Sequence, residues 1–375
     1  MVLGDAEVPV IESSSAAAYG DRLYSQMKLR DYLDYCRKRR SDDSTALYMK
    51  DWHFQRDFPN YHAYDTPLYF HSDWINLEEW PPEHPFAGDY KFVYFGVAGS
   101  WTPFHADVLR SYSWSANVSG RKLWYLVPPG KEQHFSGRNG TLLSDIRSRQ
   151  SDFCRTGVEQ LTQNKGEIVF VPAEWHHQVH NLEDTISINH NWINASNIDL
   201  VLDFIESRWS AVQLEIADCK QITDHLWFHQ QCQLILASDA RLNIDQFVQV
   251  VTLIAERRLV KLSHSSAVDL PVKILNCATH GFDLFRCKQT ESCRSRMKQG
   301  LLELCKGCHS DTLCSVCQSF FACYDLISCI LCLRRVVDMS AKFEYPAGMN
   351  EFRQVYHKLC VDVKTSLEIV EIEFC

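Results

Sequence analysis

The chain has 375 residues, 46% of them hydrophobic and 23% charged, which is the balance of a globular protein with room for one β-barrel domain and a helical extension. Its 38 basic and 47 acidic residues give a formal net charge of -9, which argues against a direct nucleic acid partner and suits a basic protein substrate. No apolar run approaches the length of a membrane span and the first residues lack the apolar core of a signal peptide, so we expect no membrane association and a cytoplasmic, or alternatively nuclear, location.

Hydrophobic periodicity divides the chain into four parts and predicts a mostly β core with an α extension. The parts are an N-terminal flank (1–40), a strand-rich core (41–195), a helical extension (196–265) and a Cys-rich, partly helical tail (266–375). The elements expected outside the core are a strand at 8–11, helices at 29–39, 223–238 and 244–260, and a further helix capped by Asn194, Ser196 or Asn197. We expect the apolar face of each helix to pack in the core, with dimerisation or substrate docking as the alternative.

The tripeptide His105-Ala106-Asp107 is a candidate for two metal ligands. In an extended strand, residues i and i+2 point to the same face, so both side chains can reach one ion. The motif alone is a weak signal, because such tripeptides occur by chance. The residues that follow predict a β-hairpin, with a turn at Ser119-Gly120 and a return strand at 121–127. Its polar face continues from the two candidate ligands, which is typical of a ligand-filled barrel interior.

A second segment, residues 166–192, contains strands predicted at 168–171 and 186–191 with a histidine-rich run between them. Four histidines lie in this region: His176, His177, His180 and His190. Periodicity does not choose among them as a third ligand. A His/Asp set without cysteine and with an open coordination face favours Fe(II) oxygenase chemistry over a closed structural zinc site.

Three motifs, TPFHAD, SGRKLW and GEIVFVPAEWHHQVHN, together resemble the JmjC family of Fe(II)- and 2-oxoglutarate-dependent oxygenases. The resemblance implies a double-stranded β-helix, a jelly-roll or cupin-like barrel flanked by helices. It implies that His177, five residues after Pro172, joins His105 and Asp107 as the third metal ligand. It also implies contacts to 2-oxoglutarate, with its distal carboxylate held by Lys122, Thr102 and Tyr48, and with Ser115 and Asn189 near the co-substrate or substrate. Without the resemblance, a solvated Lys122 is an equally good reading.

Further motifs, among them LYMKDWHFQRDFP and FHADVLRSYSWS, are similar to a subgroup of protein lysyl hydroxylases in this family. The similarity covers residues 25–260, and the chain starts closer to the core than the subgroup pattern leads us to expect. It implies hydroxylation of a lysine of the translation termination factor, using Fe(II), 2-oxoglutarate and dioxygen and releasing succinate and carbon dioxide. Methyl-lysine demethylation and a catalytically silent scaffold are the alternatives, and a homo-oligomer is compatible with the sequence.

Ten of the sixteen cysteines lie between Cys277 and Cys332. They include three CxxC pairs, Cys305–Cys308, Cys314–Cys317 and Cys329–Cys332, and such pairs invite a zinc interpretation. Against it, the first two pairs lie close together and residues 313–335 read as an apolar helix in which cysteine acts as a small hydrophobe. The second and third pairs are the better zinc candidate. A disulfide framework is disfavoured in a reducing compartment.

Overall fold

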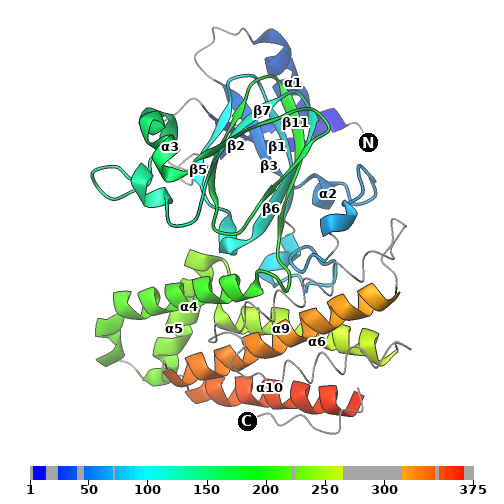
Figure 1. Cartoon of the computed structure of the whole chain (residues 1–375), viewed down its shortest axis with the longest axis vertical. Helices are drawn as coiled ribbons and strands as arrows, with labels where there is room; N and C mark the ends of the chain where they lie inside the picture. The colour runs from blue at the N-terminus through cyan, green and yellow to red at the C-terminus, as the bar shows by residue number, and fades with distance from the viewer. Residues whose placement is uncertain are drawn as a thin grey trace. The chain divides into compact units, whose positions relative to one another are not determined.

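The computed structural model describes residues 3–13, 24–39, 46–70, 72–88, 90–221, 224–264, 315–342 and 346–366. The chain divides into two compact units, the first made of residues 1–65 and 75–193 and the second of residues 66–74 and 194–375 (Figure 1). The first unit holds the described strands and the second holds the long helices α4 to α10.

The first unit contains a seven-stranded sheet in which every neighbouring pair of strands is antiparallel. Its order is β2 (Tyr24–Lys28), β1 (Glu7–Glu12), β3 (Leu47–Trp52), β4 (Lys91–Gly96), β11 (Thr185–Trp192), β6 (Tyr112–Ser119) and β9 (Ile168–Val171). A second, four-stranded antiparallel sheet has the order β5 (Trp101–His105), β10 (His176–Asn181), β7 (Lys122–Val127) and β8 (Glu159–Gln163).

Apolar side chains from both sheets pack in the space between them. Trp124 and Leu126 of β7 and Val179 of β10 form one buried cluster with Val169 and Val171 of β9. Two packed antiparallel sheets of this kind confirm the expected jelly-roll core with helices. The two sheets stay open, with edge strands, rather than joining in one continuous barrel.

The predicted hairpin across Ser119-Gly120 is wrong. β6 pairs with β11 and β9, whereas β7 pairs with β10 and β8, so the turn carries the chain from one sheet to the other. Gly120 has φ 76°, and a Cβ at this position would lie 2.2 Å from the carbonyl oxygen of Asp184. The corner therefore requires glycine, as a hairpin turn would. For this reason the Ser-Gly sequence does not reveal whether β6 and β7 pair with each other or with other strands.

Short helices cover the outer faces of both sheets. On the larger sheet, α1 (Leu29–Lys38) buries Tyr32 against a cluster that includes Met49 and Trp52, beside α2 (Phe54–Asp57). On the smaller sheet, the connection from β7 to β8 forms η5 (Glu132–Phe135), η6 (Ile146–Asp152) and α3 (Phe153–Thr156), which pack against Phe104 and Tyr125. The remaining 3-10 turns are η1 (Leu3–Asp5), η2 (Leu68–Phe70), η3 (Pro85–Gly88), η4 (Val108–Arg110) and η7 (Ala217–Gln221).

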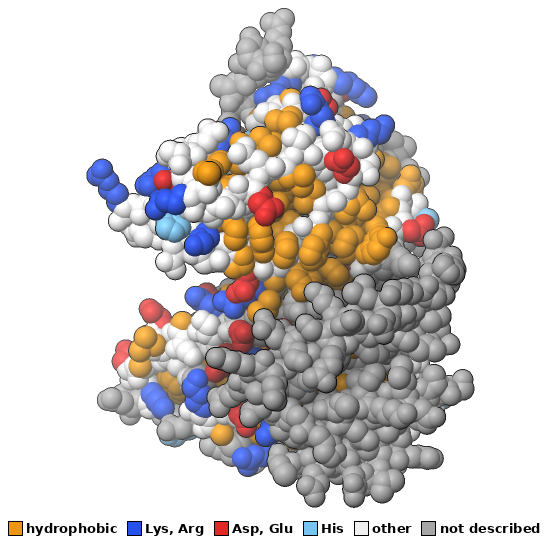
Figure 2. Space-filling model, viewed as in Figure 1, with side chains coloured by type: hydrophobic (Ala, Val, Ile, Leu, Met, Phe, Trp, Pro, Cys, Tyr) orange, Lys and Arg blue, Asp and Glu red, His pale blue; other side chains and the backbone are white. Residues whose placement is uncertain are grey.

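One part of the larger sheet keeps apolar side chains exposed. Val118, Ile168, Phe170 and Ile186 are 38–47% exposed, and Ala116 and Trp114 pair with Ile168 and Phe170 across β6 and β9. Figure 2 shows hydrophobic side chains gathered on the visible face of the first unit.

The second unit is built from α4 (Ile198–Glu215), α5 (His225–Ala240), α6 (Ile244–Ser263), α9 (Ser315–Lys342) and α10 (Pro346–Ser366). Asn197 is the residue at the N-cap of α4, but its side chain accepts from the N–H of Asn194 instead of capping. Asn243 caps α6 in a reciprocal capping box with Gln246. A partly buried ion pair, Arg258 Nε to Asp325 at 2.7 Å, joins α6 to α9.

The cysteines that the structure describes in the tail lie in the helical core. Cys329 and Cys332 are buried on α9 as free thiols, and burial raises the pKa of Cys332 to about 12. They are therefore protonated small hydrophobes. Cys305, Cys308 and Cys314 lie outside the described residues. Among the helices of the described ranges, none combines the length and apolar character needed to cross a membrane.

Candidate metal site and anion pocket

Two neighbouring strands bring the three candidate metal ligands together. His105 ends β5 and His177 lies near the start of β10, and the two residues are direct partners in the ladder between these strands. Their rings lie 4.3 Å apart between centroids. One ligand atom from each of His105, Asp107 and His177 lies within 4.8 Å of the others, and no second group of this kind occurs in the described parts of the chain.

The backbone orients both imidazoles. Nδ1 of His105 lies 2.8 Å from the carbonyl oxygen of Pro103, and Nδ1 of His177 lies 3.3 Å from that of Trp175. A carbonyl oxygen only accepts, so Nδ1 carries the proton in each ring and Nε2 keeps a lone pair for an ion. Burial, followed by the nearby charges of His177 and Lys50, holds the pKa of His105 well below its usual value. His105 is therefore neutral, as a metal ligand must be.

Hydrogen bonds hold both oxygens of the Asp107 carboxylate. Ser113 Oγ donates to Oδ2 at 2.6 Å and Asn191 Nδ2 donates to Oδ1 at 3.2 Å. Asn191 and Ser113 are partners across β11 and β6. Sequence analysis missed Asn191, because the pairing of β6 with β11 is a tertiary feature that periodicity does not contain.

The other three histidines of the second segment have different surroundings. The His176 ring packs against Phe104, with centroids 5.3 Å apart. The His190 ring lies 4.1 Å from that of Trp114, and its Nε2 lies 2.6 Å from the hydroxyl of Tyr64. Of the four, only His177 joins the candidate metal group.

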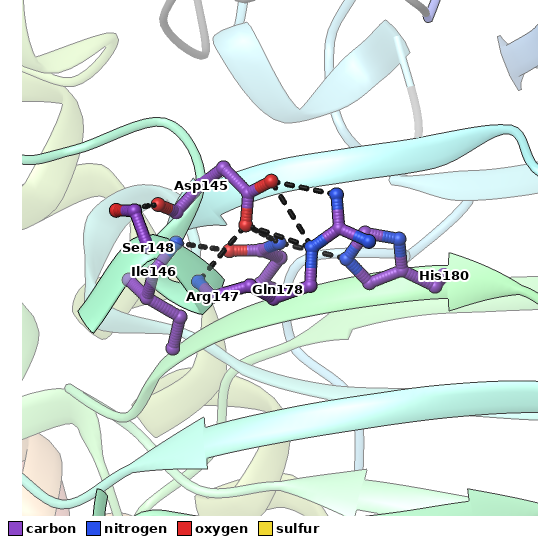
Figure 3. Close-up of polar contacts among 6 residues, drawn as sticks. All are labelled: Asp145, Ile146, Arg147, Ser148, Gln178 and His180. Carbon is purple, nitrogen blue, oxygen red and sulfur yellow. Dashed lines mark hydrogen bonds and ion pairs between the residues drawn. The ribbon is translucent and has the colours of Figure 1, made fainter. Parts of the chain in front are cut away.

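His180 belongs to a polar cluster at the back of β10 (Figure 3). Gln178 Nε2 donates to Oδ1 of Asp145 at 2.8 Å and lies 2.7 Å from His180 Nε2, while Gln178 Oε1 accepts from the N–H of Ile146 at 2.8 Å. Burial opposes ionisation of Asp145, but hydrogen bonds from Arg147 and Gln178 hold its pKa at about 2. Burial lowers the pKa of His180 to about 4, so this ring is neutral. The cluster ties η6 to the strand that carries His177.

A buried cation lies in the same interior as the metal group. Lys122 on β7 is 2% exposed and its Nζ donates to Ser187 Oγ at 2.6 Å. Burial, assisted by the charge of Lys50, lowers the pKa of Lys122 to about 7. A buried ammonium is costly without an anion, so this position favours a negatively charged ligand.

Tyr48 and Thr102 are also buried, and Thr102 pairs with Val179 of β10, the strand next to that of Lys122. Burial raises the pKa of Tyr48 to about 12, so its hydroxyl remains protonated and can donate to an anion. Asn181, whose Nδ2 approaches Gly96 as the Tyr48 ring does, pairs with Lys122 across β10 and β7. The structure therefore brings the three predicted anchors of a carboxylate into one region.

Gly96 allows this close packing. A Cβ at Gly96 would lie 2.0 Å from Asn181 Nδ2, 2.8 Å from Ser100 Oγ and 2.8 Å from Tyr48 Cε2. Any side chain here would displace the tyrosine or the asparagine, so glycine is needed for the approach of the backbone.

Ser115 and Asn189 face each other across β6 and β11. Asn189 Nδ2 donates to Ser187 Oγ at 3.1 Å, the same hydroxyl that accepts from Lys122. The Ser115 hydroxyl is buried and has no hydrogen-bond partner within the described residues. Such an orphaned hydroxyl fits a pocket that receives a polar ligand.

Sequence reasoning also missed Lys50 and Tyr94, which lie in this interior. Lys50 is 2% exposed, and its Nζ lies 5.2 Å from the centre of the Tyr94 ring. Lys50 stands in the quoted motif LYMKDW, but nothing in the sequence shows that a lysine next to an aspartate points inward.

Comparison with known proteins matches residues 92–192 to the family described as JmjC domain, hydroxylase. Residues 92–192 match a JmjC domain. The match includes His105, Asp107, Lys122 and His177, whereas Tyr48 lies before its first residue.

The chain is 42% identical over 280 residues to the 2-oxoglutarate and iron-dependent oxygenase JMJD4 of Homo sapiens, covering 71% of the chain and 65% of that protein. It is 42% identical over 274 residues to the protein of the same name from Danio rerio, covering 69% of the chain and 63% of that protein. The Arginine-specific demethylase JMJ20 of Arabidopsis thaliana is 38% identical over 247 residues, with 61% of the chain and 53% of the relative covered. The chain thus spans less than two thirds of the length of these relatives.

Proposed function

We propose that the chain is an Fe(II)- and 2-oxoglutarate-dependent oxygenase that hydroxylates a protein substrate. The observation that carries the proposal is the convergence of His105, Asp107 and His177 in the interior that also buries Lys122. The names of the JMJD4 relatives, which state iron and 2-oxoglutarate dependence, support the same chemistry.

The donor set fits Fe(II). Two imidazoles and one carboxylate, without thiolate, leave coordination positions open for co-substrate and dioxygen. With 2-oxoglutarate and dioxygen, the bound iron supplies the oxidation of a C–H bond to an alcohol, with release of succinate and carbon dioxide. Asn191 and Ser113 orient Asp107, and the carbonyls of Pro103 and Trp175 orient the two rings.

The anion pocket fits the co-substrate. Lys122 would supply a charge-assisted hydrogen bond to the distal carboxylate, with the hydroxyls of Tyr48 and Thr102 as further donors. Ser115 and Asn189 offer polar contacts beside it. Because these groups are already buried, their interactions are strengthened by the low dielectric of the interior.

We further propose that the enzyme hydroxylates a lysine side-chain carbon of a protein such as the translation termination factor. We also propose that it acts in the cytoplasm. This rests on the resemblance of LYMKDWHFQRDFP and FHADVLRSYSWS to lysyl hydroxylases, and on the net charge of -9, which suits a basic partner.

Demethylation is the second candidate, and it is favoured by the similarity to JMJ20, whose name is arginine-specific demethylase. Hydroxylation of an N-methyl group ends in loss of formaldehyde, so the same site would serve both reactions. A silent scaffold is the third reading, and the intact ligand set argues against it.

The test combines succinate release with the mass of the substrate. Purified protein is incubated with Fe(II), 2-oxoglutarate and full-length termination factor, with His105→Ala as the inactive control. We expect a gain of one oxygen atom on a lysine-containing peptide. Loss of a methyl group would support the demethylase. Succinate release that depends on His105, with no change in the mass of the termination factor, would support the oxygenase activity but refute the termination factor as its substrate. No turnover above the control would refute the enzyme.

A further inference from the structure

A β-bulge in β3 turns two consecutive charged residues toward the interior. Met49 pairs with Phe95 and Trp52 pairs with Val93, so three steps along β3 match two along β4. Met49 and Trp52 accordingly pack in the same outer cluster, although simple alternation would place them on opposite faces. Asp51 has φ 60°, in the left-handed region. Bulges of this kind re-aim side chains beside functional sites, and the backbone strain suggests a use for the residues they present.

Three partners hold the aspartate of the bulge. The Tyr94 hydroxyl donates to Asp51 Oδ1 at 2.5 Å, the Tyr24 hydroxyl donates to Oδ2, and Lys50 Nζ lies 3.3 Å from Oδ2. Burial acts to raise the pKa of Asp51, but Lys50 and the two tyrosines keep it below its usual value. The bulge therefore holds a buried lysine beside an ionised carboxylate.

Lys50 and Lys122 share one aromatic ring. Their Nζ atoms lie 5.2 Å and 5.9 Å from the centre of the Tyr94 ring. Tyr94 pairs with Ser187, which lies on β11 between Thr185, in the row of Tyr48, and Asn191, the residue that donates to Asp107. Lys50 therefore lies beside Lys122, on the metal side of Tyr48.

The charges of this interior fit a dianion. A divalent ion and two lysines, set against the carboxylates of Asp51 and Asp107, leave two positive charges. A buried charge without a partner is strongly unfavourable, so a ligand with two carboxylates is the species that would neutralise the pocket.

We propose that Lys50 is a second cationic contact for 2-oxoglutarate, binding the carboxylate on the metal side while Lys122 binds the distal one. This rests on the proposed function. In the overall reaction the bond between C1 and C2 breaks and C1 leaves as carbon dioxide. One oxygen atom of dioxygen enters the new carboxylate of succinate and the other enters the substrate alcohol. The C1 carboxylate that Lys50 binds is present in 2-oxoglutarate and absent from succinate, whose new carboxylate forms at the former C2, so Lys50 discriminates co-substrate from product.

The test compares two ligands on one protein, without turnover. The full chain is loaded with Mn²⁺ under anaerobic conditions, and the dissociation constants of 2-oxoglutarate and succinate are measured by calorimetry. For Lys50→Met we expect 2-oxoglutarate to bind about 10-fold to 100-fold more weakly, the effect of one charge-assisted hydrogen bond, and succinate to bind as in the wild type. Lys122→Met should weaken both ligands, and Lys165→Met, at an exposed lysine, should weaken neither.

Each outcome decides the proposal. Equal weakening of both ligands by Lys50→Met, or unchanged binding of 2-oxoglutarate, overturns the role of Lys50 and leaves the proposed function standing. Failure of the wild type to bind 2-oxoglutarate overturns the proposed function itself. Should Lys50→Met not fold, the double variant Lys50→Met, Asp51→Asn removes both charges of the pair and is measured in the same way. The same loss of discrimination supports the proposal, and retained discrimination overturns it.

Discussion

Replacement of Lys122 by methionine separates a binding role from a structural one. The side chain is 2% exposed and burial lowers its pKa to about 7 from a usual value of 10.5. Below pH 7 the folded protein keeps a charge that burial disfavours. A methionine of similar length removes that charge, and Ser187 Oγ still accepts from Asn189 Nδ2 at 3.1 Å. We therefore expect the ligand-free variant to be at least as stable as the wild type at pH 7.

The size of this stability difference follows from the pKa of Lys122 in the folded and unfolded states. A lysine whose pKa is lower in the folded state destabilises the fold. The destabilisation is complete at pH values below the folded-state pKa and absent above the unfolded-state pKa. The wild type should accordingly gain stability between pH 7 and pH 10.5, by a total on the order of a few kcal/mol at about 1.4 kcal/mol per pKa unit. The stability of Lys122→Met should lack this rise, so the difference between the two proteins shrinks as pH increases.

Ligand binding should change in the opposite direction. Truncating one partner of a buried charge pair costs about 2–5 kcal/mol, which is at least about 30-fold in the Kd for 2-oxoglutarate. In the wild type this affinity should also fall above pH 7, since the bound anion needs a protonated lysine. Denaturant unfolding and calorimetry with Mn²⁺ measure the two quantities. A variant that is less stable than the wild type and binds 2-oxoglutarate equally well would refute the reasoning.

Three further substitutions test the surroundings of the site. Asn191→Ala removes the amide that orients the aspartate ligand and should lower Mn²⁺ affinity about 10-fold to 100-fold, with the exposed Asn164→Ala as control; equal affinities would contradict this. Gly96→Ala should cost about 1–3 kcal/mol in denaturant unfolding and weaken 2-oxoglutarate binding, whereas Gly88→Ala, where a Cβ meets nothing within 4 Å, should change neither; equal behaviour of the two would refute the close-packing argument. His180→Phe keeps an aromatic ring but loses the acceptor for the Gln178 amide, so the free energy of unfolding should fall by about 1 kcal/mol while Mn²⁺ affinity is retained. Weaker Mn²⁺ binding would contradict the choice of His177 as the third ligand.

Much of the local structure was readable from the sequence. The strand predicted at 168–171 is β9 (Ile168–Val171), and the helix predicted at 244–260 is contained in α6 (Ile244–Ser263), because short apolar runs and helical stripes are local signals. The pairing of strands was not readable. The turn at Ser119-Gly120 has the residues of a hairpin, and only the packing of the two sheets makes it a corner.

The candidate site divides in the same way. The expectation that His105 and Asp107 lie close together needed only the alternation of a strand, whereas the choice of His177 among four histidines came from a family resemblance and agrees with the group that the structure forms. Asn191 and Lys50 escaped prediction for different reasons. Asn191 reaches the site through strand register, and Lys50 reaches it through a bulge that breaks the alternation on which sequence reasoning depends.

Both candidate histidine ligands take their orientation from a carbonyl two residues earlier in the chain. That orientation needs no ion, so the rings face the same way before any metal arrives. Nitrogen and oxygen donors bind several first-row divalent ions with affinities that rise toward copper, so the ion at such a site depends on which metals are available. The metal content of the protein will therefore follow the medium in which the cells were grown: cultures rich in nickel, cobalt or zinc will yield folded but mismetallated protein, and the remedy for such a sample is exchange of the ion and not refolding.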